Sequence, residues 1–199
     1  MTDFSQHPWL SAIPQQQEAP PPPVRRELPR PAAPQPGVPA PDQADRLPRR
    51  DVNRPAPLWW LGVHGGAGES TLAQLVPGSR AAGHAWPIGY NGAPTNVVLV
   101  ARSNASGLGA AQRAAIEWAA GTLPSVNLVG LVIVADAPGK LPKPLRELAH
   151  LLSGGVPQSW HVPWIEAWRL GEAPELEHAP KDVRALISAV NALTKATSA

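Results

Sequence analysis

The fold is decided by one stretch of sequence, Leu58-Trp59-Trp60-Leu61-Gly62-Val63-His64-Gly65-Gly66-Ala67-Gly68-Glu69-Ser70-Thr71. It begins with an apolar run of strand length, continues through a glycine-rich turn, and leads into the short apolar segment Leu72–Val76. A strand, a glycine loop and a helix in this order form the unit that binds phosphate groups in many α/β proteins. The stretch therefore predicts a βα unit with a candidate phosphate-binding loop.

Glycines are needed in such a loop because the backbone must turn tightly and aim successive N–H groups at the phosphate. Gly65, Gly66 and Gly68 supply that freedom. Ser70 stands where a hydroxyl would ligate Mg²⁺, so ATP and Mg²⁺ are the candidate ligands. The candidate nucleotide- or phosphate-binding residues are Gly65, Gly66, Ala67, Gly68, Glu69, Ser70 and Thr71.

Glu69 stands where a phosphate-binding loop carries a lysine that bridges the terminal phosphates. Two unit charges about 4 Å apart interact by about 4 kcal/mol at an effective dielectric constant of about 20, so reversing one sign opposes a polyanion strongly. We therefore do not expect ATP to bind in the usual pose. Three interpretations stay open: a structural turn in which Glu69 favours the start of a helix, phosphate binding without efficient turnover, and an active ATPase.

The rest of the chain alternates apolar runs with segments of helical spacing. The expected strands after the loop are residues 97–101, 128–135 and 159–162, and the expected helices are residues 107–120, 142–153 and 181–195. Residues 77–95 are dense in proline, glycine and small residues and predict no strand. This alternation predicts an α/β fold with a small, mostly parallel sheet of four or five strands and helices on both faces.

The N-terminal part of the chain has a different composition. Fifteen of the 26 prolines precede Leu58, and the first 57 residues lack any sustained apolar period. We expect residues 1–57 to form a disordered, proline-rich arm and residues 58–199 to form one α/β domain. The arm is one candidate docking segment for a protein partner.

Composition excludes several classes of function. The chain has no cysteine, which excludes disulfides and thiolate catalysis, and its six histidines show no metal-ligand spacing. The formal net charge is only +2, without a lysine or arginine block, so we expect no direct nucleic-acid binding. No apolar run reaches membrane-spanning length and no export signal is visible, so we expect a cytoplasmic protein.

Two further candidate sites lie outside the loop. Asp136 ends an otherwise apolar strand, where ligands of open α/β sheets bind, and it either contacts a ligand or stabilises the Asp-Ala-Pro-Gly turn. Trp160, Trp164 and Trp168 recur every fourth residue, although Pro163 prevents one helix through all three. This tryptophan-rich segment is either a partner surface or core packing near the last strand.

The segment His-Gly-Gly-Ala-Gly-Glu-Ser-Thr resembles the deviant phosphate loop of the ParA/MinD ATPases, Lys-Gly-Gly-x-Gly-Lys-[Ser/Thr]-[Ser/Thr], with His64 and Glu69 in place of the two lysines. The order of the later strands also resembles that family. The resemblance implies a reduced fold of the P-loop NTPase type. It also implies that an acidic metal-binding strand should precede Asn96, and no such strand is visible between Val76 and Asn96.

Residues 58–171 also resemble short actinobacterial proteins that combine a proline-rich arm with the segments Val-Ala-Asp-Ala-Pro-Gly and Val-Pro-Trp-Ile-Glu-x-Trp-Arg. This resemblance implies plasmid maintenance or conjugative transfer as the setting. Because His64 replaces the lysine through which ParA/MinD relatives dimerise across nucleotide, nucleotide-driven dimerisation is not expected, and the oligomeric state stays open.

These features together predict a non-catalytic, degenerate ParA/MinD-like P-loop domain that acts as an interaction or scaffold protein. Its protein partner would bind through the proline-rich arm or the tryptophan-rich segment. The alternative is a nucleotide-binding protein or slow ATPase that uses the altered loop.

Overall fold

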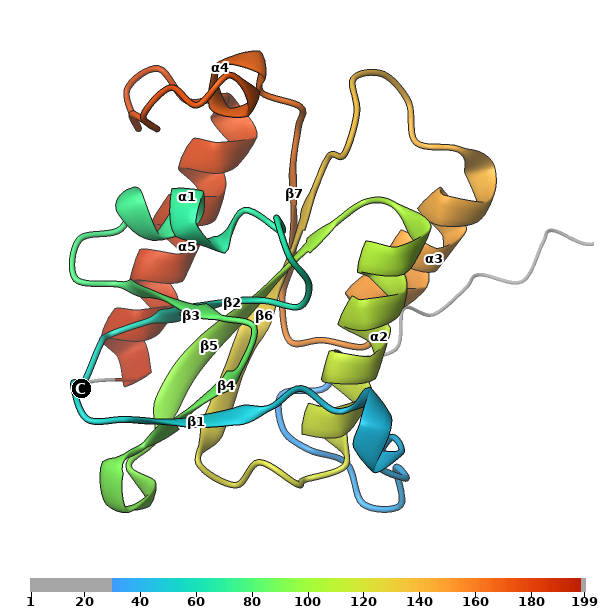
Figure 1. The fold of residues 1–199 in the computed structure, drawn as a ribbon, viewed down its shortest axis with the longest axis vertical. Coiled ribbons are helices and arrows are strands. Elements are labelled where there is room, and N and C mark those ends of the chain that lie inside the picture. Colours follow the sequence, from blue (N-terminus) through green and yellow to red (C-terminus); the bar gives the residue numbers. More distant parts are fainter. Residues whose placement is uncertain (1–29, 198–199) are drawn as a thin grey trace, which may run out of the picture.

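The computed structural model describes residues 30–197, so predictions for residues 1–29 lie outside the described residues. Its centre is a five-stranded sheet in the order β3-β2-β5-β6-β7, in which all neighbouring strands run parallel (Figure 1). The strands are β2 (Trp59–Gly62), β3 (Arg80–Gly83), β5 (Thr95–Arg102), β6 (Val126–Val134) and β7 (Ser159–Val162). The predicted α/β class and the parallel sheet are therefore confirmed.

Helices cover both faces of this sheet (Figure 1). One face carries α1 (Glu69–Gln74) and α5 (Lys181–Thr197), and the other carries α2 (Ala105–Ala119) and α3 (Lys143–Gly154). Because successive side chains of a strand point to opposite faces, Leu99 joins the core under α2 and α3, whereas Val100 joins the core under α1 and α5. Both faces of the central strands are thus buried, as their continuous apolar runs indicate.

The strand order places a topological switch between β2 and β5. Numbered by chain order within this sheet, the strands run 2-1-3-4-5, which is the doubly wound order of flavodoxin-like folds. The chain leaves β2 toward α1 on one face and leaves β5 toward α2 on the other. Ligands of open α/β sheets bind in the crevice at such a switch, outside the carboxyl ends of the strands.

The prediction of a disordered arm as far as residue 57 is wrong for part of the segment that the structure describes. A 3₁₀ turn forms at Gln43–Asp45, and β1 (Arg49–Val52) pairs in parallel with β4 (Trp86–Gly89). A buried carboxylate helps to hold this segment: that of Glu117, which is 1 % exposed and accepts hydrogen bonds from the Leu47 backbone N–H at 3.2 Å and from the Trp86 indole at 2.9 Å.

The remaining elements are short. A 3₁₀ turn at Tyr90–Gly92 leads into β5, and α4 (Glu166–Arg169) follows β7 after Pro163. Residues 77–95, where no strand was predicted, contain both β3 and β4. β3 is an edge strand of the five-stranded sheet, and β4 forms a two-stranded sheet with β1. In residues 30–197, none of the helices combines the length and apolar character that crossing a membrane requires.

Candidate functional site

The predicted site residues converge on the carboxyl edge of the sheet. The loop of residues 65–71 follows β2, Asp136 follows β6, and Trp164 follows β7 (Figure 1). Parallel strands bring their carboxyl ends to the same edge, so these residues meet although about 100 positions separate the first from the last. Trp160 differs because it lies within β7 itself.

Two of the three glycines in the loop adopt a backbone conformation that favours glycine. Gly66 and Gly68 adopt the left-handed region, with φ of 73° and 106°, which side-chain-bearing residues rarely enter. Gly65, Gly66 and Ser70 are exposed, whereas Ala67, in the same loop, is fully buried. The backbone therefore turns from β2 into α1 through this loop.

The carboxylate of Glu69 lies inside the loop. The residue is 8 % exposed, and its Oε2 accepts a hydrogen bond from the Gly68 backbone N–H at 3.2 Å. A Cβ added to Gly62 would stand 2.5 Å from the same oxygen, so the carboxylate rests directly against the end of β2. One of the N–H groups that a phosphate would require is therefore already bound to an anion of the chain itself.

His64 closes the crevice between β2 and β5. Its Nε2 accepts a hydrogen bond from the Arg102 backbone N–H at 2.9 Å, and its Nδ1 lies 2.9 Å from the Gly65 carbonyl oxygen. These partners assign the proton to Nδ1, because Nε2 must accept. A Cβ on Gly107 would stand 2.8 Å from Nε2. The His64 side chain thus bonds the loop to the end of β5.

Arg102 ties the loop to the end of β6. Its Nε donates to the Gly66 carbonyl oxygen and its Nη1 to the Ala135 carbonyl oxygen, each at 3.0 Å. Burial lowers the pKa of Arg102 below the ordinary arginine value, while Asp136, the next largest influence, opposes this shift. Nearby Arg169 lowers the pKa further. Arg102 is thus a fixed positive charge at the carboxyl edge.

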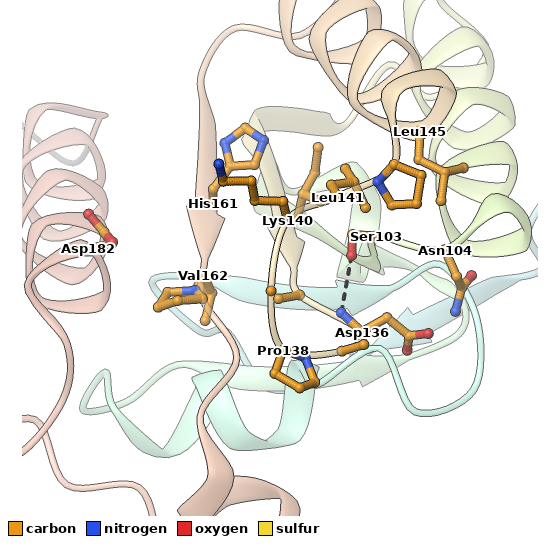
Figure 2. Close-up of a pocket in the computed structure, with 16 residues that line it drawn as sticks. Ser103, Asn104, Asp136, Pro138, Lys140, Leu141, Leu145, His161, Val162 and Asp182 are labelled. Carbon is orange, nitrogen blue, oxygen red and sulfur yellow. Dashed lines mark hydrogen bonds between the residues drawn. The ribbon is translucent and has the colours of Figure 1, made fainter.

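A cavity of about 330 Å³ opens on the α3 side of this edge (Figure 2). Its apolar walls come from the ends of β6 and β7 and from the segment that leads into α3. The polar and charged residues that line it are Ser103, Asn104, Asp136, Lys140, His161 and Asp182. An apolar cavity with a few convergent polar groups is the usual form of a small-molecule site.

Asp136 contributes to this cavity chiefly through its backbone. Its N–H donates to the Ser103 hydroxyl oxygen at 3.1 Å, which joins the loops after β5 and β6 (Figure 2). The side chain of Asp136 is exposed. In residues 30–197, no cluster of three or more histidine, aspartate or glutamate side chains has an arrangement that could hold a metal ion. The Asp136 N–H thus links the loops after β5 and β6, and its carboxylate acts on the Arg102 guanidinium, whose pKa it raises.

His161 lines the cavity and is partly desolvated there, although the residue as a whole is exposed. Desolvation lowers the pKa of His161 below the ordinary histidine value. The folded state therefore favours the neutral ring, which can both donate and accept a hydrogen bond to a ligand.

A second cavity, of about 130 Å³, lies on the α1 side of the edge. It brings together Trp164 and Trp168 with two arginines, Arg102 and Arg169. Trp160 is not among its lining residues and packs instead over Gly130, where an added Cβ would stand 2.7 Å from the indole ring. The three predicted tryptophans therefore divide between two environments.

From the sequence, Arg102 and Arg169 are two of five basic residues available to soften the charge of Glu69, but neither lies in a motif that singles it out. Arg102 is the first charged residue after the apolar run of β5, which places it at the carboxyl edge. Arg169 lies in a single helical turn after a proline, a context without a recognisable motif. The position of Arg102 at the end of an apolar strand predicts that it lies at the carboxyl edge of the sheet. The sequence around Arg169 contains no comparable pattern.

Comparison with known proteins gives one match. The model of a family described as "Family of unknown function (DUF6668)" matches residues 56–187, so the chain belongs to this family. The matched region begins just before β2 and ends within α5, and it contains every residue of the two cavities and of the glycine loop. Searches of curated proteins and of solved structures gave no match.

Proposed function

We propose that this member of the DUF6668 family is a non-catalytic interaction or scaffold protein built on a degenerate ParA/MinD-like P-loop domain. The observation that carries the proposal is the position of the Glu69 carboxylate, which is buried inside the glycine loop and bonded to the Gly68 N–H. The loop thus serves as a strand-to-helix turn stabilised by its own anion.

The charge of Glu69 supports the same conclusion. A triphosphate that entered the loop would meet this carboxylate, and expelling the side chain would leave the Gly68 N–H without its present partner. Like charges at contact distance repel by about 4 kcal/mol at an effective dielectric constant of about 20. His64 adds a second obstacle, because the bond from Arg102 already occupies its Nε2.

One observation favours the alternative, a nucleotide-binding protein or slow ATPase. Gly66 and Gly68 keep the left-handed conformation that phosphate-binding loops use. Arg102 also donates to the Gly66 carbonyl and could supply the positive charge that the loop lacks. This alternative requires the Glu69 side chain to leave the loop.

The two functions are separated by thermal denaturation of the full chain with MgATP, MgADP and MgGTP. A ligand that binds only the folded state stabilises it by RT ln(1 + [L]/Kd). We expect the midpoint of unfolding to be the same with each nucleotide as with magnesium chloride alone. A midpoint that rises with the concentration of one nucleotide would favour the alternative, and release of phosphate from ATP would establish turnover.

For the interaction itself, we propose a protein partner that binds through the proline-rich arm or the tryptophan-rich segment, in plasmid maintenance or conjugative transfer. The part of the arm before residue 30 lies outside the described residues. In the tryptophan-rich segment, Trp164 is half-buried at the carboxyl edge, and its indole N–H donates to the Glu166 carboxylate at 2.7 Å. Co-purification of the partner with wild type but not with Trp164→Ala would identify this segment as the contact.

A further inference from the structure

The cavity on the α1 side carries two positive charges and no negative one. Its ten lining residues include Arg102 and Arg169 but neither aspartate nor glutamate. Within residues 30–197, no carboxylate lies within 4.0 Å of either guanidinium. Arg169 lowers the pKa of Arg102, which reflects repulsion between the two cations, whereas Asp136 and Glu69, which do not line this cavity, raise it.

The guanidinium of Arg102 is held in place with donor groups to spare. The Gly66 and Ala135 carbonyls accept from its Nε and one N–H of Nη1. Nη2 stands 3.9 Å from the position of a Cβ on Gly68, which also lines the cavity. An arginine has five N–H donors, so three remain for a ligand.

Arg169 reaches the same cavity from α4. Its Cζ lies 5.8 Å from the centre of the Trp164 ring, a distance at which a cation is attracted to the ring face. The Trp164 indole is fixed in turn by its bond to Glu166. Thr71 adds a hydroxyl to the lining, and Trp168 adds an apolar wall.

We propose that this cavity binds a phosphate-type oxyanion, as inorganic phosphate or as the phosphate group of a small metabolite, between Arg102 and Arg169. Two guanidiniums match the charge and the several acceptor oxygens of a phosphate dianion better than those of a single carboxylate. The cavity volume of about 130 Å³ suits one such group. The site includes Gly68 and Thr71 of the glycine loop but not Glu69, and the two arginines rather than the interior of the loop would hold the oxyanion.

The test is calorimetric titration of inorganic phosphate into the full chain, with sodium chloride at matched ionic strength as the reference. We expect saturable binding and a change in the indole N–H resonances of Trp164 and Trp168, assigned from single Trp→Phe variants.

Arg169→Gln should weaken binding about tenfold or more, because a charge-assisted hydrogen bond contributes about 1.5–3 kcal/mol. Arg169 is exposed, so this variant should fold normally.

The matched control is Arg146→Gln, which removes one exposed arginine from α3, on the other face of the sheet. It should bind phosphate as wild type does, which excludes an effect of net charge. Sodium acetate should bind more weakly than phosphate. The proposal is overturned if wild type shows no saturable phosphate binding, if Arg169→Gln binds as tightly as wild type, or if acetate binds as tightly as phosphate.

Discussion

At the scale of single residues, His64 and Glu69 hold the loop together from within. Each of the two side chains finds its hydrogen-bond partner inside the fold, Glu69 at the Gly68 N–H and His64 at the Arg102 N–H. Two glycines make this arrangement possible, since Gly62 leaves room for the Glu69 carboxylate and Gly107 leaves room for the His64 ring. The space that the Glu69 and His64 side chains occupy is therefore available only because glycine stands at positions 62 and 107.

The first prediction concerns the contact between Gly62 and Glu69. An added Cβ at Gly62 would displace the carboxylate, so Gly62→Ala should destabilise the protein by about 1–3 kcal/mol. In a Glu69→Ala background the clash disappears, and the same substitution should cost at least about 1 kcal/mol less. Urea denaturation of the four proteins in this double-mutant cycle measures the coupling. Equal effects in both backgrounds would show that the carboxylate does not rest against β2.

The second prediction concerns the bond between His64 and Arg102. Removing the acceptor with His64→Ala leaves the Arg102 backbone N–H without its partner, and we expect a loss of about 1–3 kcal/mol in the free energy of unfolding. His150→Ala removes an exposed histidine from α3 and should change that free energy by no more than about 0.5 kcal/mol. Urea denaturation compares the two variants; equal stabilities would argue against a structural role for His64.

At the scale of elements, the long buried strands and the helices that follow them were predictable. The apolar runs at 97–101 and 128–135 correspond to β5 and β6, and the helix predicted at 107–120 corresponds to α2 at 105–119. Residues 159–162 were predicted as a strand and form β7. β5, β6 and α2 carry continuous apolar runs or helical periodicity, which is the primary secondary-structure signal in a sequence.

The short strands were not predictable from their own residues. β1 has the sequence Arg-Arg-Asp-Val, β3 has Arg-Ala-Ala-Gly and β4 has Trp-Pro-Ile-Gly, none of which shows the alternation of a strand. β3 pairs with β2, and β1 pairs with β4 beside the buried carboxylate of Glu117, which joins the backbone of Leu47 to the Trp86 indole. Local pattern carries no information about such contacts.

The third prediction belongs to α2, whose first turn packs tightly against the end of β5. A Cβ at Gly107 would stand 2.4 Å from the Arg102 carbonyl oxygen, so Gly107→Ala should destabilise the protein by at least about 2 kcal/mol. Gly109, two residues later, has only an ordinary contact at 3.7 Å. Gly109→Ala should therefore stabilise the helix by about 0.5–1 kcal/mol. Thermal unfolding followed by circular dichroism checks both, and effects of the same sign would contradict the packing described.

At the scale of the whole molecule, the segment before β2 is part of the folded structure. Glu117 is 1 % exposed, and its two donors come from the segment that leads into β1 and from β4. Arg49 lies 4.0 Å from the same carboxylate. Removing these partners would leave a buried charge poorly compensated, which is strongly destabilising.

The fourth prediction compares two truncated chains. A chain that begins at residue 54 lacks β1 and the Leu47 N–H, and it should be less stable by about 3 kcal/mol or more than a chain that begins at residue 30. Urea denaturation of the two chains measures the difference. Equal stabilities would place β1 outside the cooperative fold.

The candidate site was predictable in location but not in its interior. The ends of the apolar runs and the glycine loop predict one edge of the sheet as the candidate site, and the structure brings these residues to that edge. The direction in which the Glu69 side chain points, and the pairing of Arg102 with Arg169 across 67 positions, depend on packing between elements. Those are the features on which the proposed functions rest.

The central claim is that the carboxylate of Glu69 closes the loop to nucleotide. Its most direct test is calorimetric titration of MgATP into wild type and Glu69→Lys at the same ionic strength, with Glu147→Lys, an exposed site on α3, as the control for net charge. We expect no saturable binding to wild type or to Glu147→Lys, and saturable binding to Glu69→Lys. Saturable binding of MgATP to wild type, or none to a folded Glu69→Lys variant, would contradict the claim.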